Sequence, residues 1–129
     1  MVKSTGASIL IGAMTLSTSL QVLAENFTTY YPTGEIEQVR EYKEGSRFKT
    51  TDYRKTGSVK GVLEYADGKQ SKITLYYASG ADKGVGEVTD GKVSKSTIFH
   101  ANGQIKKVVE VFKNNQSKTT HYDKFGNKL

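Results

Sequence analysis

A short motif, an aromatic residue followed four positions later by glycine, occurs five times along this 129-residue chain, at intervals of 23 residues. The glycines are Gly34, Gly57, Gly80, Gly103 and Gly126, and the aromatic residues are Tyr30, Tyr53, Tyr76, Phe99 and Tyr122. A period of this length indicates a repeat protein, in which each copy is one supersecondary unit packed on its neighbours.

A second turn signal lies eleven residues after each of the first four glycines. It reads Glu44-Gly45, Asp67-Gly68 and Asp90-Gly91, and Asn114 takes the glycine position in the last copy. Acidic-glycine pairs between runs of Val, Tyr, Thr and Ile predict tight β-hairpin turns. Turns every eleven or twelve residues leave strands of about eight residues and no room for a helix of normal length. The spacing therefore predicts an all-β antiparallel meander of eight or nine strands.

The repeated residues carry a family resemblance. Tyr-Tyr-x-x-Gly-x-(Ile/Val), with a Tyr eight residues after the Gly and then a second Gly, resembles the bacterial variant of MORN repeats over residues 30–129. The closing HYDKFGNKL is also similar to the YD repeats of large secreted toxins. The resemblance implies an elongated, single-layer sheet of repeated β-hairpins, with about four repeats and a C-terminal half-repeat. A closed barrel is the alternative, and it needs an apolar interior or a polar lumen.

A two-residue turn at Asp67-Gly68 fixes a predicted strand register. It pairs Val59 with Tyr76, Gly61 with Thr74, Leu63 with Lys72 and Tyr65 with Gln70. This register predicts one basic, aromatic face, formed by Lys49, Lys72, Lys95 and Lys118 with Tyr53, Tyr76, Phe99 and Tyr122. The glutamates at the matching positions (Glu41, Glu64, Glu87 and Glu110) fall on the opposite face. Such a face suits an extended anionic polymer or surface; the alternative is that these residues are only good strand formers.

The third copy departs from the pattern. Asp82 replaces an aliphatic residue, and Gly84 and Gly86 thin out the strand that follows it. Glycine inside a strand permits close approach of another backbone or a ligand, or it marks a local bend or bulge. These three residues form a candidate irregular site.

The first 24 residues have the features of a secretory signal peptide. Lys3 gives a positive start, an apolar stretch follows from Ala7 to Leu16, and Val22-Leu23-Ala24 matches a cleavage site. An uncleaved membrane anchor is the alternative. With cleavage, residues 25–129 form the repeat domain, no transmembrane span remains, and the chain is periplasmic or secreted.

The sequence contains little that suggests chemistry. His100 and His121 occupy different places in their repeats, and no nucleophile stands in a recognisable turn beside a base. No enzyme activity, metal or cofactor is expected. The net charge of +6 is a mild bias towards anionic partners.

These features predict an exported, non-catalytic repeat protein that binds another protein or an anionic envelope component. The alternatives are a toxin-neutralising inhibitor of the antitoxin or immunity type, a binder of anionic polymer or lipid, and a purely structural envelope component. Nucleic acid is not expected as a partner.

Overall fold

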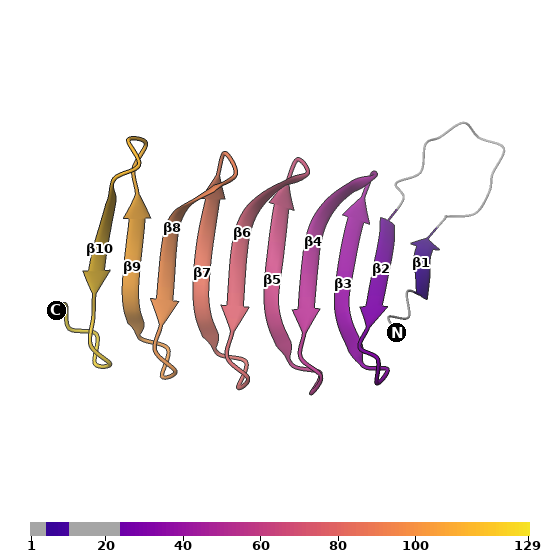
Figure 1. Cartoon of the computed structure of the whole chain (residues 1–129), viewed down its shortest axis with the longest axis horizontal. Coiled ribbons are helices and arrows are strands. Elements are labelled where there is room, and N and C mark those ends of the chain that lie inside the picture. The colour runs from indigo at the N-terminus through magenta and orange to yellow at the C-terminus, as the bar shows by residue number, and fades with distance from the viewer. Residues whose placement is uncertain (1–4, 11–23) are drawn as a thin grey trace.

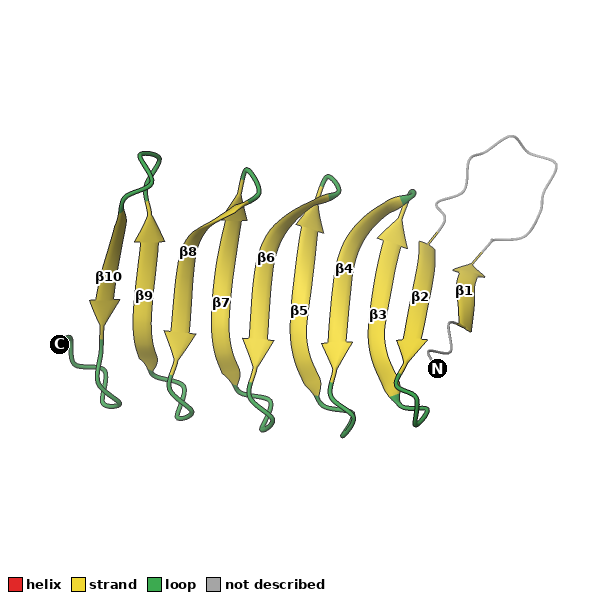
Figure 2. Cartoon of the chain, in the orientation of Figure 1, coloured by secondary structure: helices red, strands yellow, loops and turns green. Residues whose placement is uncertain are grey.

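The computed structural model describes residues 5–10 and 24–129, which form ten β-strands and no helix (Figure 2). The strands are β1 (Thr5–Leu10), β2 (Ala24–Tyr30), β3 (Ile36–Lys43), β4 (Ser46–Tyr53), β5 (Val59–Ala66), β6 (Lys69–Tyr76), β7 (Asp82–Thr89), β8 (Lys92–Phe99), β9 (Ile105–Val111) and β10 (Ser117–His121). They pair antiparallel in strict chain order from β1 to β10, and β1 and β10 are not paired with each other.

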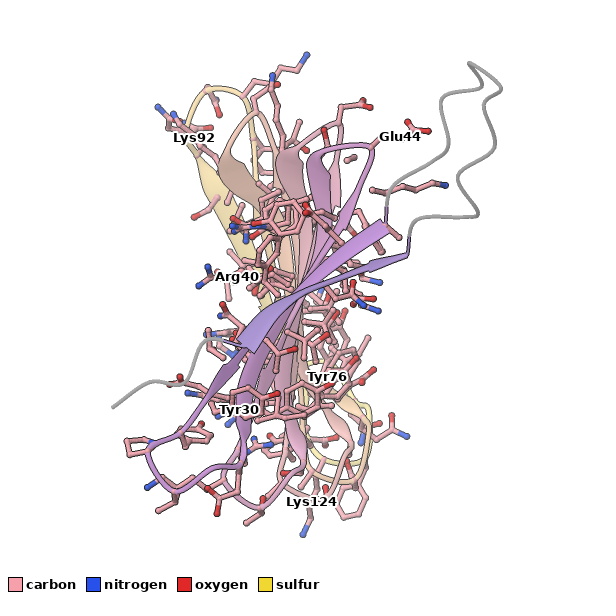
Figure 3. All side chains as sticks on the ribbon, turned by 90° about the vertical axis from the view of Figure 1, so that its right-hand side faces the viewer. Tyr30, Arg40, Glu44, Tyr76, Lys92 and Lys124 are labelled. Carbon is pink, nitrogen blue, oxygen red and sulfur yellow. The ribbon has the colours of Figure 1, made fainter. Side chains whose placement is uncertain are left out.

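The sheet is open and elongated, with one strand after another in a single row (Figure 1). Viewed along its length, it is a twisted layer with side chains on both sides (Figure 3). The predicted all-β meander and the open sheet are confirmed, and the closed barrel is not formed. Eight of the strands, β3 to β10, lie in the predicted repeat domain, and β2 begins one residue before it, at Ala24.

The acidic-glycine pairs form the turns that their chemistry predicts. Asp67 and Gly68 have φ angles of 50° and 73°, and the pairs at 44–45 and 90–91 are nearly identical. Two consecutive positive φ values define the type I′ turn, which matches the twist of a hairpin. The last copy differs, because its positive φ belongs to Asn115 and not to Asn114. There, the Phe112 N–H donates to the Gln116 carbonyl at the base of a five-residue loop.

The glycines of the 23-residue motif end a second kind of turn. In the first copy the Tyr31 N–H donates to the Glu35 carbonyl, and the Gly34 N–H donates back to the Tyr31 carbonyl. The same two bonds recur in the other four copies, starting at residues 54, 77, 100 and 123.

A β-bulge shifts the predicted register within each of the first three hairpins. Tyr65 pairs with Gln70 as predicted, but Glu64 then pairs with Lys72, which leaves Ser71 without an opposite residue. Beyond this bulge the actual pairs are Leu63–Ile73, Val62–Thr74 and Gly61–Leu75. The predicted pairs Val59–Tyr76, Gly61–Thr74 and Leu63–Lys72 are therefore wrong, because one extra residue exchanges the two faces of a strand.

Neighbouring repeats are joined by a side chain at one position. The Tyr31 hydroxyl donates to the Tyr53 carbonyl at 2.7 Å, and Tyr77 makes the same bond to Phe99 at 2.9 Å. Arg54 reaches the Tyr76 carbonyl at 2.6 Å, and His100 Nε2 lies 3.2 Å from the Tyr122 carbonyl. We call these four residues, each bonded 22 positions ahead, the clamp residues.

No apolar side chain among residues 24–129 is buried, so this part of the chain has no conventional hydrophobic core. The buried side chains there are three threonines: Thr50, Thr51 and Thr74. Stability must therefore come from the ladder hydrogen bonds and from side-chain contacts across strands.

The predicted signal peptide lies largely outside the described residues, which exclude 1–4 and 11–23. Of its cleavage site the structure describes Ala24 alone, as the first residue of β2. β1 pairs with β2 through Thr5–Thr28 and Leu10–Ala24. No helix in the described part of the chain is long and apolar enough to cross a bilayer.

Candidate functional site

One face of the sheet consists of rows of residues that recur in every repeat. The central row alternates threonine and valine over nine strands: Thr28, Val39, Thr51, Val62, Thr74, Val85, Thr97, Val108 and Thr120. Each member is the direct partner of the next, so all share one face. We call this surface the ladder face.

The second row of the ladder face alternates glutamate and lysine. Its order is Glu41, Lys49, Glu64, Lys72, Glu87, Lys95, Glu110 and Lys118. The Lys49 ammonium lies 2.8 Å from the Glu41 carboxylate, and its hydrogen bond to that carboxylate raises the pKa of Lys49. The prediction that the lysines and glutamates occupy opposite faces is wrong, because the bulges of the first three hairpins and the five-residue loop of the last one bring both onto the ladder face.

The third row contains three of the four predicted aromatic residues; the fourth, Tyr122, follows β10 and forms an isolated bridge with Lys128. Tyr53 pairs with Val59, Tyr76 with Asp82, and Phe99 with Ile105. The lysines and aromatics of the predicted binding face thus do share one surface. Each interior lysine, however, has a glutamate opposite it on both sides, so the row has no net positive charge along its length.

The other face has few recurring residues, and we call it the variable face. Figure 3 shows Arg40 on this side of the layer and Tyr76 on the ladder side. Three sets of equivalent positions illustrate the variation: Gln38, Gly61, Gly84 and Lys107; Arg40, Leu63, Gly86 and Val109; Asp52, Leu75, Ile98 and His121. Each set mixes residues of different size and charge, whereas the equivalent ladder-face positions at Val, Glu, Thr and Lys are invariant.

The N-terminal part of the variable face is polar. Gln38 Nε2 donates to the Asp52 carboxylate at 2.6 Å, and Arg40 Nε donates to the Gln38 side-chain oxygen. Together with Tyr31 and Glu37, these side chains line an open cleft of about 470 Å³.

Next to this cleft lies a small aromatic cluster. Arg47 donates to the Tyr42 hydroxyl at 2.7 Å, and its guanidinium lies 5.3 Å from the Tyr42 ring centroid and 5.6 Å from that of Tyr65. The Tyr42 hydroxyl also raises the pKa of Arg47. Phe27 meets Tyr42 edge to face, with ring centroids 5.3 Å apart.

The C-terminal part of the variable face is apolar. Leu75 is 46% exposed and Val93 is 43% exposed, and Ile73 and Ile98 lie on the same face nearby. Between them, Gly84 and Gly86 of β7 contribute no side chain. The predicted irregular site therefore divides: Gly84 and Gly86 face this apolar area, whereas Asp82 pairs with Tyr76 in the ladder-face row. β7 is a regular eight-residue strand with the same bulges as its neighbours.

Sequence reasoning missed the variable face, although a signal for it was present. In a repeat protein, a position that recurs serves the shared architecture, and a position that varies is free to serve something else. The clamp residues were missed for a different reason. They are of three different types (Tyr, Arg and His), although each bonds the equivalent backbone carbonyl of the next repeat.

Titratable side chains do not gather into a metal site in the described part of the chain, which holds no group of three or more His, Asp or Glu with suitable geometry. His100 is a clamp residue, and His121 lies opposite Lys107 on the variable face.

Comparison with known proteins shows the fold alone. No family model and no curated protein matches the chain. A crystal structure of accessory secretory protein 1, 2 and 3 in Streptococcus pneumoniae is similar, with a TM-score of 0.50 and 13% identity over 72% of this chain and 18% of that one. A crystal structure of the GtfA/B complex bound to UDP and GlcNAc aligns at a TM-score of 0.39 and 10% identity, over 87% of this chain and 25% of the other. The chain thus spans a quarter or less of each of these two solved chains.

Proposed function

We propose that this chain is an exported, non-catalytic repeat protein that binds another protein through its variable face. The observation that carries the proposal is the division of the two faces. Among the strand positions, the Val, Glu, Thr and Lys that recur in every copy lie on the ladder face, whereas the positions of the variable face carry residues that differ between copies. The leader-like first 24 residues support export.

The surface chemistry of the variable face supports a protein partner. Leu75 and Val93 are exposed on this face beside the half-buried Ile73 and Ile98. Such an apolar area is typical of protein interfaces, because its burial removes apolar surface from water. The adjoining Arg40, Gln38 and Asp52 add directional hydrogen-bonding groups, which give an interface its specificity.

The geometry favours a protein over an anionic polymer. Binding of a polyanion draws on an uninterrupted line of cations that displaces counterions. Here the lysine row alternates with glutamates on the same surface, so a polyanion would meet a carboxylate at every second strand.

Retention of partners from an envelope extract on the immobilised full chain tests the proposal. A double variant of the variable face, Leu75→Glu with Ile98→Glu, should lose a protein that the native chain retains through a high-salt wash. The matched double variant of the ladder face, Lys72→Ala with Lys95→Ala, should retain it. Polysaccharide or lipid that binds at low salt, is released by salt and is lost only in the lysine variant would overturn the proposal in favour of a polymer binder.

A further inference from the structure

Gly84 and Gly86 are not explained by the fold. Neither has a positive φ. A Cβ on Gly84 would lie 3.5 Å from the Thr97 carbonyl oxygen, and one on Gly86 would lie 3.9 Å from its nearest neighbours, so alanine would fit at both positions. Glycine weakens a strand interior relative to residues with side chains. The two glycines therefore leave a furrow along β7 that the chain itself does not fill.

A ridge of aliphatic side chains lies beside this furrow. Ile73 and Leu75 project from β6 on the same face, and they are the direct neighbours of Gly86 and Gly84 in the sheet. A twofold rotation about an axis parallel to the strands, placed between β6 and β7, brings β6 of one copy over β7 of another. It places the Leu75 and Ile73 side chains over the furrow of the second copy, and the reverse contact forms at the same time.

We propose that two copies of this chain pack variable face to variable face about this axis. The rotation also sets β5 over β8, and β4 over β9, of the second copy. Residues that share a row stay at the same height, so Gly61 meets Ile98 and Asp52 meets Lys107 of the second copy. Gly84 and Gly86 thus lie opposite Leu75 and Ile73, and an acidic residue lies opposite a basic one. The room over Gly61 is different, because Leu75 of the same copy already covers it: its Cδ2 would lie 3.1 Å from a Cβ at that position.

The pairing resolves the lack of a core. A single sheet with exposed apolar residues on one face becomes a two-layer sandwich, in which side chains from the two inner faces interdigitate. A twofold interface requires one surface to complement itself, and the alternation of ridge and furrow provides that. This inference rests on the proposed use of the variable face and names one occupant of it.

Cysteine cross-linking tests both the face and the axis, since the chain has no cysteine of its own. Leu63 and Ser96 lie three strands apart in one copy, about 14 Å, which is too far for an internal disulfide. The axis brings Leu63 of one copy over Ser96 of the other. The full chain with Leu63→Cys and Ser96→Cys should form a disulfide-linked dimer under mild oxidation. The matched pair Val62→Cys with Thr97→Cys, on the same strands but facing the other way, should stay monomeric in a denaturing gel.

Sedimentation of the full chain provides a second test that needs no cysteine. The native chain should show a monomer–dimer equilibrium, and Gly84→Val should raise its dissociation constant at least about tenfold by overfilling the furrow. Asp52→Lys should also weaken the dimer, and the additional change Lys107→Asp should restore it. A native chain that is monomeric at every concentration, or cross-linking of the ladder-face pair alone, would overturn the inference. The chain could be monomeric and still retain an envelope protein that the Leu75→Glu, Ile98→Glu variant does not retain. In that case the proposed function stands without the dimer.

Discussion

Glu64 and Lys72 lie directly opposite each other on β5 and β6, with 3.6 Å between the carboxylate and the ammonium. Lys72 also has Glu87 opposite it on β7. The pair is therefore one segment of a continuous row of alternating charges, and each of its members is balanced from two sides. The charges of this row neutralise one another within the sheet, so we interpret the row as a structural element of the repeat.

Reversal of one charge in this row should destabilise the sheet. Lys72→Glu places three carboxylates in line, and like charges directly opposite each other destabilise a sheet by up to about 1 kcal/mol per pair. We expect the free energy of unfolding, measured with urea at low salt, to fall by about 1 kcal/mol. The fall should be smaller in 1 M NaCl, because salt screens these exposed side chains. Lys69→Glu, at a turn, serves as the control. An effect that does not change with salt would contradict the electrostatic origin.

Removal of a clamp residue should loosen the junction between two repeats. Arg54 donates to the Val59 carbonyl at 2.7 Å and to the Tyr76 carbonyl at 2.6 Å, so Arg54→Ala leaves both without this partner. We expect the free energy of unfolding to fall by about 1–3 kcal/mol, and hydrogen exchange to become faster around residues 54–59 and 76–81. Arg54→Tyr should recover part of the loss, because Tyr31 and Tyr77 make the equivalent bond in their own copies.

Replacement of a buried hydroxyl should stabilise the protein. Thr50 is 2% exposed, and its hydroxyl has no hydrogen-bond partner. Because Thr50→Val keeps the shape of the side chain and removes the unpaired polar atom, we expect a gain of about 1 kcal/mol. Thr50→Ala should destabilise, since it removes the methyl contacts as well. Thermal unfolding of both variants at low protein concentration is the measurement, and a less stable Thr50→Val would be the contrary result.

The C-terminal turn should be sensitive to acid. Asp123 accepts hydrogen bonds from Asn127 and from the Phe125 and Asn127 amides, and the Asn127 side chain is the main cause of its lowered pKa. A carboxyl group with a lowered folded pKa stabilises the turn above its ordinary value of 3.8, and that stabilisation is lost as the pH falls through the folded pKa. In the native chain, the protection of the Phe125 and Asn127 amides against exchange should therefore fall as the pH is lowered through the folded pKa of Asp123. In Asp123→Asn, which has no carboxyl group at this position, the protection of these two amides should not change over that pH range.

The sequence allowed the strands and turns to be predicted because these depend on local chemistry. Asp67-Gly68 and its equivalents take positive φ wherever they occur, and the period then sets every strand. The faces depend on something less local. A bulge at Ser71, three residues after the turn, decides whether Lys72 shares a face with Glu64. A serine at this position does not by itself predict a bulge. The recurrence of Glu and Lys at the same separation in each copy was a usable hint, because only the bulged register neutralises both rows.

The absence of a buried apolar core within residues 24–129 has a thermal consequence. The heat capacity of unfolding rises with the apolar surface newly exposed to water, about 12–15 cal/mol/K per residue in ordinary globular domains. A dissociated copy of this chain keeps its apolar side chains within residues 24–129 partly exposed, so its value should fall below this range. Its stability curve should accordingly be shallow, varying little between cold and warm conditions, and it should steepen only at concentrations where a second layer covers the first.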